Sequence, residues 1–183
     1  MPDVYRPRKD SYLLKEAVEQ QELDGKHVLD MGTGSGIIAA AAVEHGAEVT
    51  AVDIDPDAVA HVRDRFSGED RVSVVRSDLF DSVTGTFDII AFNPPYVPST
   101  EKEQESGQTW AGGEDGRDVV DGFLSAAADY LAPGGNILLL QSTRNDLETT
   151  RARFTAEGLE PSVVAREQLH FEELVVFEAV PTA

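Results

Sequence analysis

The sequence predicts an α/β fold in which a mostly parallel sheet carries helices on both faces. Short apolar runs that are typical of buried strands alternate with helical segments along most of the chain. The first strand leads into a glycine-rich loop and then a helix, an arrangement found in nucleotide-binding α/β proteins. The last two strands have no helix between them, so we expect them to pair as an antiparallel hairpin.

The helices are indicated by apolar residues at helical spacing and by signals at their ends. Either Asp10 or Ser11 can cap the first helix, and Pro56 suits the first turn of the third. Pro133-Gly134-Gly135 is expected to end the fourth helix. The predicted helices span residues 10–22, 37–45, 56–66, 118–131 and 147–157.

The strands are short apolar or alternating runs bounded by turn residues. Residues 87–92 follow the turn-like Thr84-Gly85-Thr86 and are apolar enough for a fully buried strand of a parallel sheet. The predicted strands span residues 27–30, 48–52, 71–76, 87–92, 136–141, 162–167 and 174–180.

The composition fits one globular domain over residues 1–183, with an arm and helix over residues 1–24 packed on the main body. The content of hydrophobic residues is 41%, and there are no cysteines, which excludes disulfides and thiolate metal sites. The four histidines show no ligand spacing, so we expect no metal. The start lacks the apolar core of a signal peptide and no run could span a membrane, so we expect a soluble, cytoplasmic protein.

The net charge of −19 is extreme for 183 residues, and only four of the cations are lysines. The acidic side chains of such a surface repel one another in dilute buffer. The repulsion costs little free energy in molar salt, where the Debye length falls to about 3 Å. We therefore hypothesise a halophilic source, the alternative being an ordinary acidic domain. The sequence offers no basic stripe for nucleic-acid phosphates, which makes nucleic acid an unexpected partner.

The glycine loop follows an acid that ends the first strand. Gly32, Gly34 and Gly36 allow a ligand to approach the backbone closely, but Ile37 stands where a dinucleotide-binding loop has glycine. The leading carboxylate of Asp30 would repel a pyrophosphate and suits a cationic ligand with an ammonium group.

Two further acids end the next two strands. Asp53 lies 23 residues beyond Asp30, near the separation at which such folds hold a ribose diol. Asp78 ends the third strand, where its carboxylate could accept from an adenine amine. Each of these acids alone could be a loop residue or a helix cap. Three acids at three successive strand ends favour a ligand site.

The motif Asn93-Pro94-Pro95-Tyr96 follows the buried strand 87–92 and is the predicted reaction centre. The prolines force an extended loop that can aim two acceptors, the Asn93 amide oxygen and the Pro94 carbonyl, at one planar amine. Tyr96 can cover the face of that amine. Two fixed acceptors would stabilise the transition state of attack by a delocalised nitrogen. An ordinary Pro-Pro turn at the end of a strand is the alternative.

The segment 98–117 is polar, rich in glycine and too long for a plain connection, so we expect a lid or substrate loop. Its Trp110 is the only tryptophan of the chain. It either anchors the loop on the body or contacts the substrate.

These motifs resemble the class I S-adenosylmethionine-dependent methyltransferases, and nearly the whole chain takes part. The start, residues 5–14, and the segment 110–117 look like the HemK/PrmC-related glutamine methyltransferases. The branch they resemble most is the archaeal and eukaryal one, which methylates the glutamine of the Gly-Gly-Gln motif in peptide-chain release factors. The resemblance implies a Rossmann-like seven-stranded sheet of order 3-2-1-4-5-7-6 with an antiparallel last strand.

The resemblance also implies roles for particular residues. The predicted catalytic residues are Asn93, Pro94, Pro95 and Tyr96, with Asn93 binding the glutamine amide. The predicted S-adenosylmethionine-binding residues are Ser11 for the carboxylate, Asp30 and Gly32 for the methionine part, Asp53 for the ribose, and Asp78 with Leu79 for the adenine. Thr33, Gly34, Ile54 and Asn93 are also predicted to bind the cofactor. Arg6, Arg8 and Lys9 depart from the family, which usually has an acid near Asp10.

Two partners follow from the resemblance: a release factor as substrate, and a small zinc-binding activator. The implied sheet order leaves the strand 71–76 at an edge, where the activator could add a strand. Two other functions stay open. An Asn-Pro-Pro-Tyr loop serves the amines of flipped adenine or guanine equally well, so the chain could methylate nucleic acid. It could also be a non-catalytic subunit that binds the cofactor.

Overall fold

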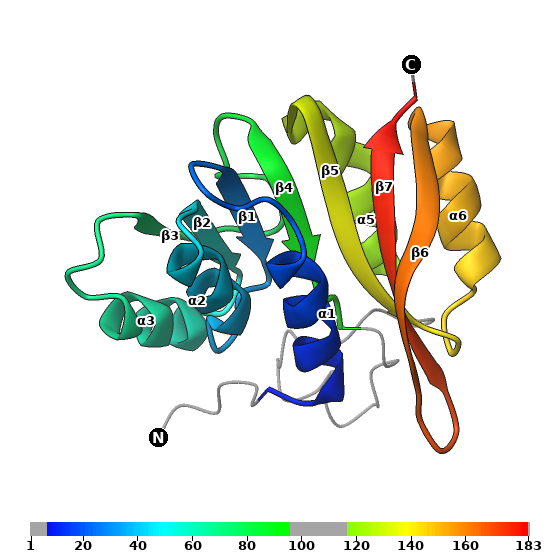
Figure 1. The fold of residues 1–183 in the computed structure, drawn as a ribbon, viewed down its shortest axis with the longest axis horizontal. Helices are drawn as coiled ribbons and strands as arrows, with labels where there is room; N and C mark the ends of the chain where they lie inside the picture. The colour runs from blue at the N-terminus through cyan, green and yellow to red at the C-terminus, as the bar shows by residue number, and fades with distance from the viewer. Residues whose placement is uncertain (1–6, 96–116, 183) are drawn as a thin grey trace.

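The computed structural model describes residues 7–95 and 117–182, and Figure 1 shows its seven-stranded sheet between two layers of helices. The strand order is β3-β2-β1-β4-β5-β7-β6, as the resemblance implied. β3, β2, β1, β4 and β5 are parallel, and β7 is antiparallel to both of its neighbours. The strands are β1 (His27–Met31), β2 (Glu48–Asp53), β3 (Val72–Arg76), β4 (Phe87–Phe92), β5 (Leu131–Ser142), β6 (Leu159–Gln168) and β7 (Glu173–Pro181).

The helices divide between the two faces because neighbouring residues of a strand point to opposite sides. Val28 and Ile89 join the cluster beneath the first three helices, whereas Leu29 and Ile90 join the cluster beneath the last two. The helices are α1 (Lys9–Glu19), α2 (Ile37–Glu44) and α3 (Pro56–Arg65) on one face, and α5 (Asp118–Ala127) and α6 (Leu147–Ala156) on the other, with a 3-10 turn η1 (Ala128–Tyr130) after α5.

Several predicted boundaries differ from the structure, and two of these differences change how a motif is interpreted. The first helix ends at Glu19, and it begins one residue earlier than expected, with Arg8 as its N-cap in place of Asp10 or Ser11. The Ser11 hydroxyl instead accepts from the Arg8 N–H at 3.4 Å, as the third residue of the helix. Ser11 therefore acts from inside the first turn, with Asp10 beside it.

The fourth helix ends at Ala127, and Pro133-Gly134-Gly135 lies within a strand. β5 begins at Leu131, which pairs with Phe87, but its pairing shifts before Asn136 meets Ile89. Gly135 packs so closely on the β4 backbone that a Cβ atom would lie 2.8 Å from the Phe87 carbonyl oxygen. The glycine pair is thus part of a bulge in β5, whereas the sequence predicted only that it ends the fourth helix.

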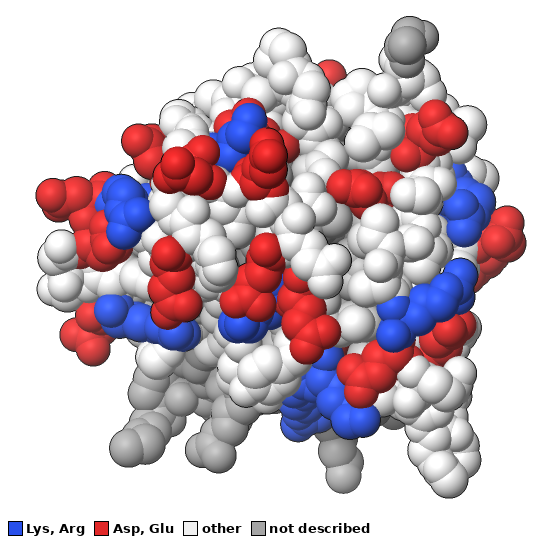
Figure 2. Space-filling model, viewed as in Figure 1, with Lys and Arg blue, Asp and Glu red and all other residues white. Residues whose placement is uncertain are grey.

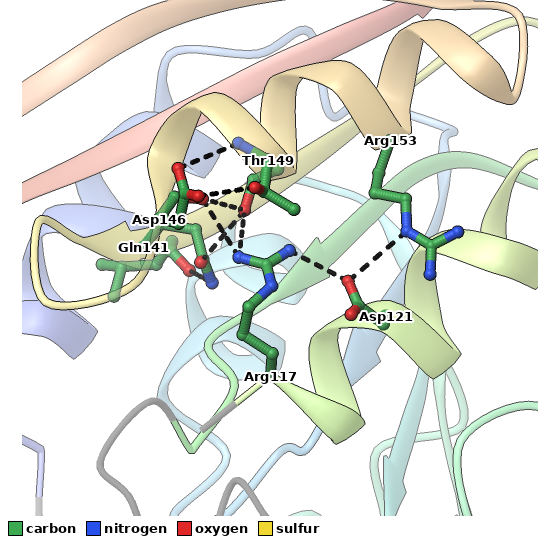
Figure 3. A network of polar contacts seen from close by, with 8 residues as sticks. Arg117, Asp121, Gln141, Asp146, Thr149 and Arg153 are labelled. Carbon is green, nitrogen blue, oxygen red and sulfur yellow. Dashed lines mark hydrogen bonds and ion pairs between the residues drawn. The ribbon is translucent and has the colours of Figure 1, made fainter. Parts of the chain in front are cut away.

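A polar network joins α5 to the start of α6 (Figure 3). The largely buried Arg117 guanidinium donates to the Asp121 carboxylate at 2.9 Å, to the Asp146 carbonyl at 3.0 Å and to the Thr150 hydroxyl at 3.1 Å. Asp146 caps α6 by accepting from the Thr149 N–H and hydroxyl. These bonds fix the position of α5, whose first turn reaches the pocket described below.

None of the helices in the described part of the chain is long and apolar enough to cross a membrane.

Candidate active site

A pocket of about 340 Å³ lies at the carboxyl ends of β1, β2 and β4. Its volume is within the range of roughly 300–1,000 Å³ that is common for small-molecule sites. The described residues that line it are Arg8, Asp10, Ser11, Asp30, Met31, Gly32, Thr33, Gly34, Ser35, Ile37, Ile38, Asp53, Ile54, Ser77, Asp78, Leu79, Phe92, Asn93, Pro94, Pro95 and Val119. The structure thus brings together all of the predicted site residues that it describes.

The glycine loop forms the floor of the pocket between β1 and α2. Gly32 and Gly34 have positive φ angles of 64° and 50°, which disfavour any other residue. A Cβ atom on Gly32 would also lie 3.1 Å from the Phe92 ring. The Thr33 N–H donates to the Val52 carbonyl at 2.8 Å, which ties the loop to β2. The backbone is therefore held where a ligand can approach it.

Asp30 is the buried acid at the end of β1. Its Oδ2 accepts from the Thr33 hydroxyl at 2.6 Å and from the Ala39 N–H at 3.1 Å. Burial raises the pKa of Asp30 to about 7, the two hydrogen bonds oppose that rise, and the nearby Asp53 carboxylate adds to it. The raised pKa means that ionising the buried carboxyl costs free energy. A cation in the pocket would offset that cost, so Asp30 is suited to an ammonium group.

Asp53 ends β2 and is also buried. One carboxylate oxygen accepts from the Gly34 N–H at 2.9 Å and the other from the Asp55 N–H at 3.0 Å. Burial raises the pKa of Asp53 despite these bonds. The next residue, Ile54, leaves 37% of its surface exposed at the pocket wall. The carboxylate is thus fixed, and an apolar surface lies beside it.

Asp78 and Leu79 form the wall beyond β3. Asp78 is exposed, and Leu79 has a φ of 44°, the one positive φ of a non-glycine residue in the described ranges. A Cβ atom on Gly122 of α5 would lie 3.1 Å from Leu79 Cδ1. A larger residue at position 122 would have to displace Leu79, so the close approach of α5 shapes this wall.

Asn93 connects the pocket to α1. Its Nδ2 donates to Asp10 Oδ2 at 3.2 Å, which turns the amide so that Nδ2 faces α1. Its Oδ1 is buried, and no group within residues 7–95 and 117–182 donates to it. An unpaired buried acceptor costs about 1–3 kcal/mol. The position is therefore ready to receive an N–H from a ligand.

Asp10 is the site residue that the sequence reading missed, because we treated it as a possible helix cap. It is buried, and its Oδ1 accepts from the N–H of Ser11 at 2.7 Å. Arg8 is named above only as a departure from the family. Among the described residues that line the pocket, it is the one cation beside four acids. A buried carboxylate is uncommon in the first turn of a surface helix, but burial cannot be seen in the sequence.

The predictions for Tyr96, Trp110 and the segment 98–116, and the remark on Arg6, lie outside the described residues.

The chain was compared with known proteins. A family model described as the methyltransferase small domain matches residues 8–169. A protein N5-glutamine methyltransferase of Methanocaldococcus jannaschii is 38% identical, covering 97% of this chain and 92% of the relative. The human methyltransferase HEMK2 is 31% identical, covering 96% of this chain and 89% of the relative.

A solved structure agrees with these relatives. It is that of the E. cuniculi Mtq2–Trm112 complex, described as responsible for methylation of the translation termination factor eRF1. The match has a TM-score of 0.79 and 28% identity, and it covers 98% of this chain and 99% of that one. The acids at three strand ends, the glycine loop and the Asn93 motif all lie within the matched family region. The chain belongs to the methyltransferase small domain family.

Proposed function

We propose that this protein transfers a methyl group from S-adenosylmethionine to the side-chain amide nitrogen of the glutamine in a Gly-Gly-Gln motif of a peptide-chain release factor. The observation that carries the proposal is the Asn93 Oδ1 atom, a buried acceptor in the pocket that has no donor among the described residues. The names of the glutamine-methylating relative and of the complex that methylates eRF1 support the choice of substrate.

The residues of the pocket fit S-adenosylmethionine. The ligand carries a sulfonium and an ammonium as cations and one carboxylate as anion. The described part of the pocket lining holds four acids and one arginine. Asp30 would hold the ammonium, Asp53 the ribose hydroxyls, and Arg8 with Ser11 the carboxylate. Asp78 and the Leu79 backbone would hold the adenine, with Ile54 against the ribose. When bound, the cofactor supplies a methyl group activated for attack by a nucleophile.

The chain's own residues would hold the nucleophile. The nitrogen of a glutamine amide is a poor nucleophile because its lone pair is delocalised into the carbonyl. Asn93 Oδ1 and the Pro94 carbonyl would each accept one of its two N–H bonds, and the hydrogen bond to Asp10 keeps the Asn93 amide from rotating. Pro95 stiffens the loop, and Tyr96 would cover the amide. Fixed acceptors of this kind need no reorganisation during the reaction.

The test of this function is methyl transfer from radiolabelled cofactor in molar KCl. The acceptors are the recombinant release factor, its Gly-Gly-Gln→Gly-Gly-Ala version, total RNA and total DNA. We expect label on the unaltered factor alone. Label on RNA or DNA would make the protein a nucleic-acid amine methyltransferase, and label on no acceptor, with the partner below present, would leave a subunit that only binds the cofactor.

We further propose that a small zinc-binding protein adds a strand to the edge of β3. Val49 donates to the Arg71 carbonyl and Ser77 donates to the Asp53 carbonyl. Since parallel strands alternate, the N–H and C=O groups of Val72, Val74 and Arg76 face away from β2. The Val72 N–H donates to the Glu69 carbonyl, and the Val74 carbonyl accepts from the Arg63 side chain. Among the described residues, this leaves the Val74 N–H and the backbone of Arg76 for a partner strand. The Mtq2–Trm112 complex, in which a similar chain is bound to another protein, supports the existence of a small partner.

The opposite edge of the sheet is less suited to a partner strand. β6 contains Pro161, and its pairing with β7 shifts between Val163 and Ala165, which marks a bulge. Prolines and bulges are the usual protection of exposed edges. The pairing of β3 has no such shift, so β3 is the edge that is open to addition.

Replacement of Val74 by proline should abolish binding of this partner. The change removes an outward N–H but leaves the bonds of β3 to β2 in place. We expect Val74→Pro to lose the co-purifying small protein while its melting temperature with cofactor stays within a few degrees of the unaltered protein. A soluble, fully active chain with no partner present would contradict the proposal.

We also propose that the acidic surface is an adaptation to high salt and that the protein works in the cytoplasm as one domain over residues 1–183. Figure 2 shows Asp and Glu scattered across one face with Lys and Arg between them, and the chain has a net charge of −19. The melting temperature should rise by more than about 10 °C from 0.1 to 3 M KCl, as screening reduces repulsion. A melting temperature that is equal throughout would show an ordinary acidic protein.

A further inference from the structure

The hairpin of β6 and β7 ends in an exposed tip at the end of the sheet where the pocket lies. β6 and β5 are both antiparallel to β7, so the carboxyl end of β6 lies at the same end of the sheet as those of β1, β2 and β4. Figure 1 shows the hairpin extending past the body at this end, on the side where α1 begins. An ion pair of 2.9 Å between Lys9 and Glu167 joins β6 to α1, whose next two residues line the pocket.

The tip is held in one shape by hydrogen bonds. The Leu169 N–H donates to the Glu172 carbonyl at 2.8 Å, and the Gln168 side chain donates to the carbonyls of both residues. The Ser142 hydroxyl donates to the Glu172 carboxylate, and the Glu173 N–H donates to the Thr143 hydroxyl at 3.0 Å. The turn after β5 therefore fixes the tip to the body.

Phe171 stands on this fixed tip with 83% of its surface exposed. Its ring lies edge-on to the neighbouring His170, with the ring centres 4.5 Å apart. Of the large hydrophobic residues that the structure describes as exposed, the others are between 37% and 53% exposed. A rigid, exposed aromatic side chain loses little entropy when it enters a partner's recess, and such residues often dominate binding energy.

Three cations surround the tip, each paired with a less exposed acid. The exposed fractions of the side chains are 66% for Lys9 against 32% for Glu167, 51% for Arg144 against 16% for Glu172, and 56% for Arg166 against 28% for Glu173. Lys and Arg also gather at the lower end of the face in Figure 2. In a chain of charge −19, this surface presents its positive groups outward.

We propose that the hairpin patch, formed by Lys9, Arg144, Arg166 and Phe171, binds the protein substrate at an acidic surface with an apolar recess, beside the residue that is methylated. This inference rests on the proposed function. A protein surface fits better than a nucleic acid, because the exposed Phe171 ring needs an apolar recess and the three cations can flank that contact. A phosphate backbone would need an excess of unpaired cations, whereas each of these is paired with an acid. The open edge of β3 lies at the other end of the strand order, so substrate and small partner can bind together.

The test compares Phe171→Ala with Val180→Ala, which trims an exposed residue at the opposite end of the same hairpin. Both variants, in complex with the small partner, are assayed with the full release factor and with a short peptide that contains Gly-Gly-Gln. Phe171→Ala should raise KM for the full factor on the order of tenfold. It should leave KM for the peptide and the Kd of the cofactor unchanged, and Val180→Ala should behave as the unaltered protein.

Three results would overturn the inference: an unchanged KM for the full factor, an equal loss with the peptide, or a change of oligomeric state in Phe171→Ala measured by light scattering. Inhibition by RNA of the unaltered enzyme but not of Phe171→Ala would assign the patch to nucleic acid. Direct binding of the factor, measured by calorimetry, separates this inference from the proposed function. Binding that depends on Phe171 without methyl transfer would refute only the function. Methyl transfer to the factor, with binding that does not depend on Phe171, would refute only the inference.

Discussion

Replacement of Asn93 by alanine should lower methyl transfer by a factor on the order of 10²–10³ and leave the Kd of S-adenosylmethionine within about threefold. The expected size follows from the loss of one fixed polar group that acts in the transition state. Asn93 Oδ1 is the buried acceptor without a donor among the described residues, and Nδ2 already bonds to Asp10. Single-turnover rates with saturating cofactor, and calorimetry for the Kd, measure the two effects separately.

A second variant tests the orientation of this side chain. Asn93→Asp keeps acceptor oxygens but removes the Nδ2 donor and places a second carboxylate beside Asp10. We expect its rate to fall nearly as far as that of Asn93→Ala. Rates close to those of the unaltered protein would mean that the bond to Asp10 does not position the acceptor. Loss of cofactor binding in Asn93→Ala, equal to the loss of rate, would make Asn93 a cofactor residue.

Replacement of Asp30 by asparagine should stabilise the protein without ligand and weaken cofactor binding on the order of 10- to 100-fold. In the folded state burial raises the pKa of Asp30 to about 7, against an ordinary value of 3.8. Between these values the folded state binds more protons than the unfolded state, so the free energy of unfolding falls as pH rises from about 4 to about 7. Above pH 7 the carboxyl is ionised in both states, and the full cost of burying its charge lowers the free energy of unfolding by at most about 4 kcal/mol.

Asparagine carries no charge, so this cost disappears, and its amide oxygen can still accept from Thr33 and Ala39. The melting temperature of Asp30→Asn should therefore exceed that of the unaltered protein by several degrees at pH 8, with no gain near pH 4. Cofactor affinity of the unaltered protein should fall up to tenfold per pH unit below pH 7, and that of the variant should stay flat. The exposed Asp64→Asn is the matched control, for which we expect neither effect.

A variant that binds cofactor as tightly as the unaltered protein, or that is less stable at pH 8, would contradict the role given to Asp30.

The sequence predicts the elements whose evidence is local. Each of these is indicated by a pattern within a few neighbouring residues: the buried strand 87–92, the glycine loop, and the acids at positions 30, 53 and 78. Their convergence follows from topology, since parallel strands present their carboxyl ends at one edge. The strand order itself came from the resemblance, because periodicity does not show which strands are neighbours.

The features that the sequence did not reveal depend on contacts between distant segments. The bond between Asp10 and Asn93 joins residues 83 positions apart and exists only because α1 docks over the β4 loop. The sequence predicts that the glycine pair of β5 ends the preceding helix, and only the packing against β4 shows that it is a bulge within a strand. In the sequence Phe171 looks like any other turn residue. Only the structure shows that it stands on a rigid tip and that its side chain is exposed.

The most direct test of the proposed reaction is tandem mass spectrometry of the release factor after incubation with the enzyme, its small partner and S-adenosylmethionine. The expected result is one added methyl group, located on the side-chain nitrogen of the glutamine in Gly-Gly-Gln, and its absence when the enzyme is Asn93→Ala. A methyl group on another residue, or an unmodified factor in a mixture that methylates nucleic acid, would contradict the assignment of Asn93 as the acceptor for a glutamine amide.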